Sequence, residues 1–273
     1  MIRRLSLPVL FSYLLCSLVF TFPLVLRLTT HVPGEVEGDV PVYIWNLWWM
    51  QQALSTGISP LFTDYIFAPY GASLAFHAFV FLKAFIAIPL QWFCSAWTAY
   101  NLLILLTFAL AGYGMFVLAR HLTGDRRAAW VAGLLYAFSP YMLTRGLGHL
   151  NYLSGEWMPL YVLCLIRLLE TRERRWAVWG ALCLLLTAYC EYYYLIYLTM
   201  FTDSPSVNLL CPSTTSKSPI TSPSNICTRS FMLWPVAMER FKAFSSSTKN
   251  TIRPLSRSNI ECLGTTICSS EMR

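Results

Sequence analysis

Acidic, aromatic and turn-forming residues are concentrated in the segment that follows the first apolar run of this chain. Residues 28–50 read LTTHVPGEVEGDVPVYIWNLWWM, and residues 60–77 read PLFTDYIFAPYGASLAFH. A carboxylate in such a segment can take a proton from an attacking hydroxyl as a general base, or it can hold a divalent cation. Carboxylates beside aromatic rings suit a polar, ring-shaped substrate. The segment therefore predicts a functional site.

The acids of this segment have different local contexts. Asp39 follows Gly38 and precedes Val40-Pro41, which predicts a turn just before an aromatic helix. We interpret Asp39 as a catalytic residue, and Glu35 and Glu37 as solvated loop acids. A divalent cation held by such a carboxylate is the one cofactor that this chemistry leaves open.

Four further residues of the segment are candidates for substrate binding. Asp64 either contacts substrate or forms an Asx turn. Trp48 and Trp49 either stack on a sugar or belong to an aromatic belt at the membrane surface. His77, at the end of the segment, completes this group.

A second polar segment, residues 145–157, reads RGLGHLNYLSGEW. We interpret His149 and Glu156 as catalytic candidates, and Arg145 and Asn151 as substrate-binding ones. The alternative is structural, in which His149 and Glu156 cap the ends of helices. Arg145 and Lys83 are also candidate partners for a phosphate, although Lys83 could instead extend to the membrane surface.

The composition indicates an integral membrane protein of the all-α class. The chain is 56% hydrophobic and only 12% charged, whereas about a quarter of the residues of a soluble domain are charged. The net charge of +7 comes from short basic clusters beside apolar runs, which argues against nucleic acid as a partner and indicates cytoplasmic anchors. The nine cysteines form no Cys-x-x-Cys pair, so no zinc or dithiol site is indicated.

Five apolar runs are predicted to span the membrane: residues 5–26, 98–118, 128–143, 152–169 and 176–201. Arg120, Arg126 and Arg127 form one basic connection, and residues 172–175 form another. If both face the cytoplasm with the N-terminus, residues 76–93 form an interfacial or re-entrant helix rather than a span. A large first outer loop, residues 27–97, and the loop at 145–157 then share the outer face, where Asp39, His149 and Glu156 can meet.

The character of the chain changes near residue 203. Residues 203–230 are rich in Ser, Thr and Pro and show no helical or strand periodicity. We therefore divide the chain into a membrane domain, residues 1–202, and a tail, residues 203–273. The tail is either a disordered segment or the product of a shifted reading frame.

Four segments carry a resemblance to a known family: GDVPVYIWNLWW, PLFTDYIFAPYGASLAFH, AYNLLILLTFALAGYGMFVLARHLTG and YAFSPYMLTRGLGHLNYLSGEWMPLYVLCLIRLLE. They resemble the N-terminal part of bacterial GT-C-superfamily membrane glycosyltransferases, across roughly residues 5–201. The resemblance implies a polytopic enzyme of the bacterial inner membrane that uses a lipid-linked sugar, a polyprenyl-phosphate donor. It also implies an essential acid in the first outer loop, where Asp39 stands, and another in the second, where Glu156 and His149 stand.

Members of that superfamily continue with more spans. We therefore expect residues 1–273 to be an N-terminal part without measurable transfer by itself. Two other functions stay open: a transporter or solute-binding protein whose outer acids bind cations or polar solutes, and a catalytically inactive remnant. Charges within the spans would favour the transporter, and Lys83 and Glu191 are almost the only ones.

Overall fold

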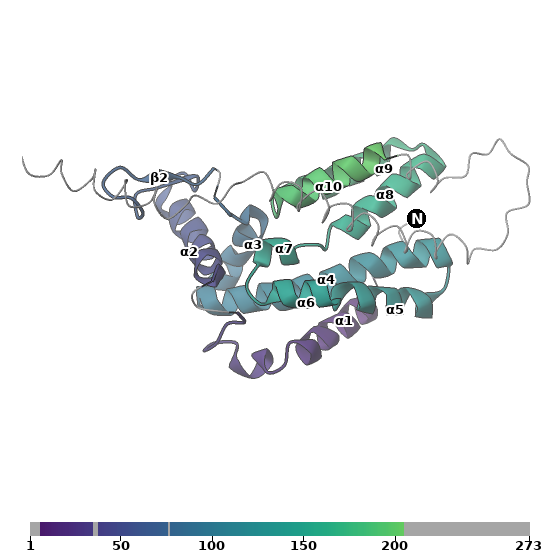
Figure 1. The fold of residues 1–273 in the computed structure, drawn as a ribbon, viewed down its shortest axis with the longest axis horizontal. Coiled ribbons are helices and arrows are strands. Elements are labelled where there is room, and N and C mark those ends of the chain that lie inside the picture. Colours follow the sequence, from purple (N-terminus) through teal and green to yellow (C-terminus); the bar gives the residue numbers. More distant parts are fainter. Residues whose placement is uncertain (1–5, 35–37, 76, 205–273) are drawn as a thin grey trace, which may run out of the picture. The chain divides into compact units, whose positions relative to one another are not determined.

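The computed structural model describes residues 6–34, 38–75 and 77–204, and helices make up most of them. This confirms the all-α class (Figure 1). The elements are α1 (Leu7–Phe20), η1 (Leu24–Arg27), α2 (Val40–Thr56), β1 (Phe62–Thr63), β2 (Ala72–Ser73), α3 (Phe81–Gln91), α4 (Ala96–Thr123), α5 (Arg126–Ala137), α6 (Pro140–Gly146), α7 (Leu150–Leu153), α8 (Met158–Thr171), α9 (Arg174–Ala188) and α10 (Tyr192–Asp203). The two short strands pair antiparallel, with Phe62 opposite Ser73.

The longest helix, α4, organises the bundle. Its 28 residues extend about 42 Å, which exceeds the ~30 Å hydrocarbon core of a bilayer. The Ser95 side chain accepts a hydrogen bond from the Thr98 amide at one end, and Gly124 ends the helix with φ = 72° at the other. Helices α1 and α5 lie on one side of α4, and α8, α9 and α10 lie on the other (Figure 1).

Two stretches of the described chain are long and apolar enough to cross a membrane. One is α4, and the other runs from Leu150 to Thr171 and includes α7 and α8. Helices α1 and α3 are apolar but shorter. The chain is therefore suited to association with a membrane by these two stretches.

Glycines let α1 approach the other helices closely. The buried Tyr13 side chain of α1 lies against Gly112 of α4 and Gly133 of α5, and its hydroxyl donates to the Trp130 carbonyl at 2.8 Å. A Cβ atom at Gly133 would lie 2.1 Å from the Tyr13 hydroxyl, and one at Gly112 would lie 2.8 Å from its ring. Both positions therefore require glycine as long as Tyr13 keeps this place.

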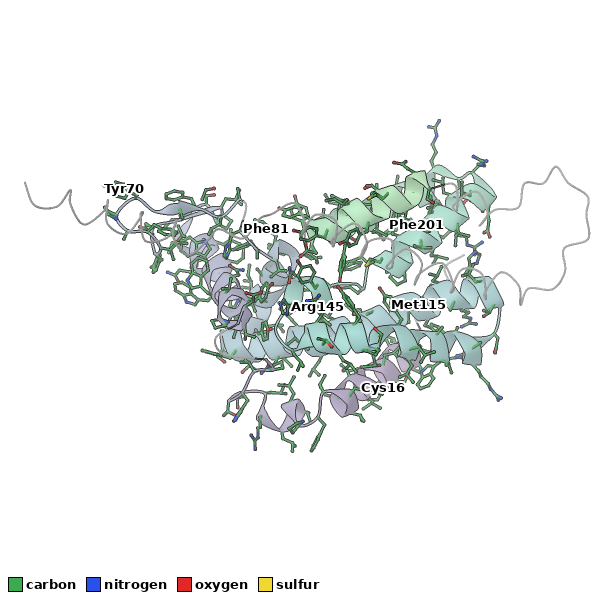
Figure 2. All side chains as sticks on the ribbon, in the orientation of Figure 1. Cys16, Tyr70, Phe81, Met115, Arg145 and Phe201 are labelled. Carbon is green, nitrogen blue, oxygen red and sulfur yellow. The ribbon has the colours of Figure 1, made fainter. Side chains whose placement is uncertain are left out.

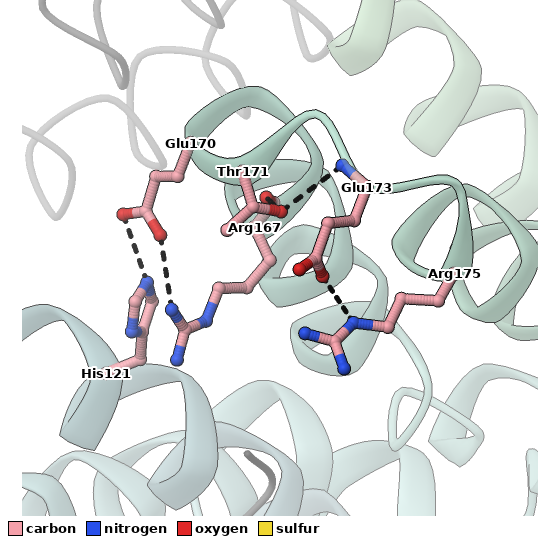
Figure 3. Close-up of polar contacts among 6 residues, drawn as sticks. All are labelled: His121, Arg167, Glu170, Thr171, Glu173 and Arg175. Carbon is pink, nitrogen blue, oxygen red and sulfur yellow. Dashed lines mark hydrogen bonds and ion pairs between the residues drawn. The ribbon is translucent and has the colours of Figure 1, made fainter.

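The two basic connections lie at the same end of the bundle. His121, at the end of α4, lies 3.3 Å from Glu170 at the end of α8, which joins the two helix ends (Figure 3). Arg167 and Arg175 pair with Glu170 and Glu173 in the same region (Figure 3).

Four of the five predicted spans are interrupted. In the run at 5–26, α1 ends at Phe20 and only η1 follows, and the run at 152–169 begins in α7 and resumes in α8 at Met158. The run at 128–143 breaks at Ser139-Pro140, where the Ser139 side chain accepts from the Met142 amide and begins α6. The run at 176–201 was predicted as one span, but the structure divides it into α9 and α10. Glu191 begins α10 by accepting a hydrogen bond from the Tyr193 amide. Mean hydropathy does not detect such breaks, because the flanking residues remain apolar.

Helix α3 is too short to span a membrane, as predicted for this segment. Its 11 residues extend only about 16 Å. Lys83, in its first turn, bonds to Thr107 near the middle of α4, and the chain then returns to Ser95 at the start of α4. The helix therefore runs from the middle of the bundle to one of its ends.

Candidate functional site

Asp39 occupies the turn that was predicted for it. It is the N-cap residue of α2, but its side chain makes no capping hydrogen bond, so the carboxylate is available for other contacts. The side chain is 59% exposed. The helix that follows Asp39 is buried on one face, because Val40, Tyr43 and Leu47 all face the core.

The structure brings Asp39 and His149 together. The Asp39 Oδ2 and His149 Nε2 atoms lie 3.6 Å apart, although they belong to two distant loops. Gly34 fixes the contact between these loops, because a Cβ atom there would lie 2.2 Å from the Leu147 carbonyl oxygen and its φ is +102°. His149 is the N-cap residue of α7, but its side chain makes no capping hydrogen bond. The alternative that this side chain caps a helix end is therefore not found for His149.

A buried chain of hydrogen bonds runs from α2 to the start of α10. The Tyr43 hydroxyl donates to Asn151 Oδ1 at 2.5 Å, and Asn151 Nδ2 donates to Glu191 Oε2 at 2.5 Å. Burial, with a further contribution from the negative charge of Asp39, raises the pKa of Tyr43. Tyr43 therefore stays a protonated donor, and Asn151 is held from both sides rather than free to bind substrate.

Sequence reasoning did not place Tyr43 and Glu191 at the site. A signal existed for Glu191, since a single carboxylate inside an apolar run is costly unless it is hydrogen-bonded. No comparable signal existed for Tyr43, which is one of many tyrosines.

Glu156 does not join the Asp39–His149 pair. Instead, it forms an ion pair with Lys83, and the two side chains are only 3% and 4% exposed. The Lys83 ammonium also donates to Thr107 Oγ1 at 2.6 Å. Asp39, His149 and Glu156 were expected to lie together, but only Asp39 and His149 do so. Lys83 does not extend to the surface, and its charge is not available for a phosphate.

Arg145 lies at the end of α6, where it meets α7 (Figure 2). Its guanidinium carbon is 5.0 Å from the centre of the Tyr152 ring and 5.3 Å from that of Tyr141. Stacking of this kind fixes the plane of an arginine while leaving its donors free for an anion.

The two tryptophans differ in their environments. Trp49 is only 1% exposed, and its indole donates to the Pro60 carbonyl, so it can neither stack on a sugar nor lie at the membrane surface. The reason is its position on the inner face of α2. Trp48 is half-buried and packs edge-on against Tyr65. His77 packs edge-on against Trp45, and burial lowers its pKa.

Asp64 is exposed and begins the loop that joins β1 to β2. The side chain that forms the turn there is Thr63, whose hydroxyl accepts from the Tyr65 amide. Glu35, Glu37 and the tail from residue 205 onward lie outside the described residues.

The possible divalent cation finds no complete ligand set in the part of the chain that the structure describes. No three His, Cys, Asp or Glu side chains come close enough there to hold a metal ion. Asp39 and His149 would supply two ligands at most. We therefore assign no step of a mechanism to a metal.

Comparison with known proteins places the chain in a family without assigning an activity. No curated protein and no solved structure gives a significant match to it. One family model matches residues 9–247, and this match continues beyond the boundary predicted at residue 202. The chain belongs to this family, which is described as a domain of unknown function, DUF6311.

Proposed function

We propose that this chain forms the N-terminal part of a membrane glycosyltransferase of the GT-C type. It would transfer a sugar from a polyprenyl-phosphate donor to an acceptor at the outer face of a bacterial inner membrane. The single observation that carries the proposal is the contact of Asp39 with His149, which come from two loops and are both accessible. An exposed carboxylate that is held beside an imidazole can act as a general base toward a bound hydroxyl.

The proposed placement in the membrane rests on the difference between the two ends of the bundle. The basic connections lie together at one end, and we assign this end and the N-terminus to the cytoplasm. We place α4 across the bilayer as one span. The other four spans are α1 with η1, α5 with α6, α7 with α8, and α9, and α3 is a re-entrant helix. Asp39 and His149 then lie at the outer face.

The reaction is a single displacement with inversion. An acceptor hydroxyl attacks the anomeric carbon of the donor, and the bond from that carbon to the phosphate oxygen breaks. Asp39 takes the proton of the hydroxyl, and the phosphate leaves with the bonding electrons. His149 orients the Asp39 carboxylate, while Arg145, stacked on two tyrosine rings, offers its donors to the phosphate.

A groove in the structure supports the proposal that the sugar donor is linked to a lipid. It measures about 480 Å³ and is mostly apolar, with Arg27 and His31 among the residues that line it. Val32, Pro33 and Leu147 also line it, and they lie close in sequence to Asp39 and His149. A lipid chain in this groove would therefore have its phosphate near both loops.

Retention of the donor by the purified chain tests the proposal without requiring turnover. The chain in detergent is incubated with a radioactive polyprenyl-phosphate sugar, and the bound radioactivity is measured after gel filtration. We expect retention by the wild type and by Arg172→Gln, which changes an exposed arginine at the opposite end. We expect about tenfold weaker retention by Arg145→Gln, since a charge-assisted contact contributes roughly 1.5–3 kcal/mol. Equal retention by both variants would remove the proposed phosphate site.

A transporter or solute-binding protein is the second candidate. It is favoured by the burial of Lys83, Glu156 and Glu191 inside the bundle, because ionisable groups at such depth often mark a path for ions or protons. Uptake of a polar solute or a proton by vesicles that contain the chain, abolished in Glu191→Gln, would favour this function over the transferase.

A further inference from the structure

The end of the bundle opposite Asp39 has a groove of its own. It measures about 520 Å³ and lies between the beginnings of α1 and α5, beside α4. The residues that line it include Val9, Phe116, Arg126, Arg127, Trp130 and Val131. The candidate site does not use any of them.

The walls of the groove are apolar, and its rim is basic. Val9 and Phe116 are buried at its floor, whereas Val131 is 48% exposed on its open side. Arg126 and Arg127 are exposed at its rim. A third cation is close, because the Arg120 guanidinium lies 5.9 Å from the centre of the Phe116 ring.

The single acid of this lining is already satisfied. Asp125 Oδ1 accepts from the Arg127 amide at 3.0 Å, and Oδ2 accepts from the Ala128 amide at 3.1 Å. These backbone hydrogen bonds lower the pKa of Asp125. Its carboxylate is therefore ionised and engaged with the start of α5, and the two arginines leave this part of the rim with a net positive charge.

A basic rim above an apolar wall matches an amphiphile with an anionic headgroup. In the proposed orientation this groove opens at the cytoplasmic surface, where anionic lipids attract basic residues by about 1 kcal/mol per residue. Trp130 adds an indole at the same level, and its Nε1 atom donates to Ser12 at 3.0 Å. A soluble anion would use the arginines but gain nothing from the apolar wall.

We propose that this groove is a binding site for an anionic phospholipid of the cytoplasmic leaflet. The phosphate lies between the Arg126 and Arg127 side chains, and one acyl chain lies along Val131 and Phe116. The inference uses the membrane orientation proposed above but not the transferase chemistry. The lipid would hold α1 against α5 at the point where both enter the membrane.

The test compares two pairs of arginines that lie at the same end of the bundle. The full chain is purified in detergent, and bound phosphatidylglycerol and phosphatidylcholine are measured by native mass spectrometry. The wild type should retain phosphatidylglycerol in preference to phosphatidylcholine. The double variant Arg126→Gln/Arg127→Gln should lose on the order of tenfold in affinity for phosphatidylglycerol. The matched control Arg172→Gln/Arg174→Gln, with the same change in charge, should stay within twofold.

A second pair of variants tests the groove without altering charge. Val131→Trp fills the groove from its exposed side and should weaken lipid binding, whereas Val178→Trp, on the exposed face of α9, should not. Equal losses in both double arginine variants, displacement by millimolar inorganic phosphate, or no preference for phosphatidylglycerol would each overturn the proposal. The transferase proposal is tested with Arg145→Gln and a sugar donor, whereas the lipid site is tested with other variants and with phosphatidylglycerol. Failure of one proposal can therefore be distinguished from failure of the other.

Discussion

Lys83 of α3 and Glu156, 73 residues later, form an ion pair within the helical bundle rather than on its surface. The pair joins the first turn of the short helix α3 to the segment that precedes α8. Thr107 of α4 accepts a further hydrogen bond from the lysine, so three elements meet at one ammonium group. The contact explains how an apolar helix that is too short to span a membrane is held against the longest one.

Removal of one member of this pair should destabilise the protein strongly. Lys83→Met or Glu156→Gln leaves a buried polar group without its partner, and each should lower the free energy of unfolding by about 3–5 kcal/mol. The double variant Lys83→Met/Glu156→Leu should recover most of this loss. Unfolding in detergent, followed by circular dichroism, measures the differences. As a control, Glu173→Gln breaks an exposed pair and should cost less than about 1 kcal/mol.

Replacement of Asp39 should affect chemistry and not folding. In a form of the protein that catalyses transfer, Asp39→Asn should lower the rate by about 10²–10⁴-fold, because loss of a general base has this effect. Asp203→Asn, at the exposed end of α10, is the matched control and should be nearly silent. Normal turnover by purified Asp39→Asn would exclude Asp39 from the mechanism.

The orientation in the membrane can be tested by labelling single cysteines. After the native thiols are replaced, Ser59→Cys should react with an impermeant reagent in intact cells, since the first loop is placed outside. Arg126→Cys and Thr171→Cys should react only after the cells are opened. The reverse pattern would invert the arrangement and move Asp39 to the cytoplasm.

His77 should make the stability of the first loop depend on pH. Burial lowers its pKa below the ordinary value of 6.5, so the unfolded loop binds a proton more readily than the folded one. The stabilisation is therefore complete above pH 6.5 and is lost as the pH falls toward the lowered pKa. Limited proteolysis of residues 58–76 at pH 7.5 and pH 5 should show faster cleavage at the lower pH. His77→Gln should reduce this difference, and a persistent difference would assign it to another group.

Local patterns predicted much of the framework. The long apolar run of α4, the turn at Asp39 and the short helix after His77 all follow from hydropathy, turn residues and the distribution of arginines. These features depend on residues close in sequence. Helix type and approximate ends are set by such neighbours, which explains why they could be predicted.

The pairings inside the bundle could not be predicted in the same way. Nothing near Lys83 or Glu156 in the sequence shows that the two meet, and Trp49 resembles Trp48 until the buried face of α2 is known. The division between α9 and α10 was missed because Glu191 begins a helix by accepting hydrogen bonds, including one from Asn151. Its partner lies 40 residues away. Contacts of this kind depend on the packing of the whole bundle.

The position of Tyr13 between Gly112 and Gly133 also determines when α1 can pack against its neighbours during synthesis of the chain. Tyr13 bonds to Trp130, which leaves the ribosome 117 residues later. At ~5–20 residues per second, α1 must wait roughly 6–23 s before the glycine surfaces that receive it exist. During this interval α1 lacks the surface of α5 that its Tyr13 side chain contacts in the folded chain. Its final place is therefore decided only when α5 has been made.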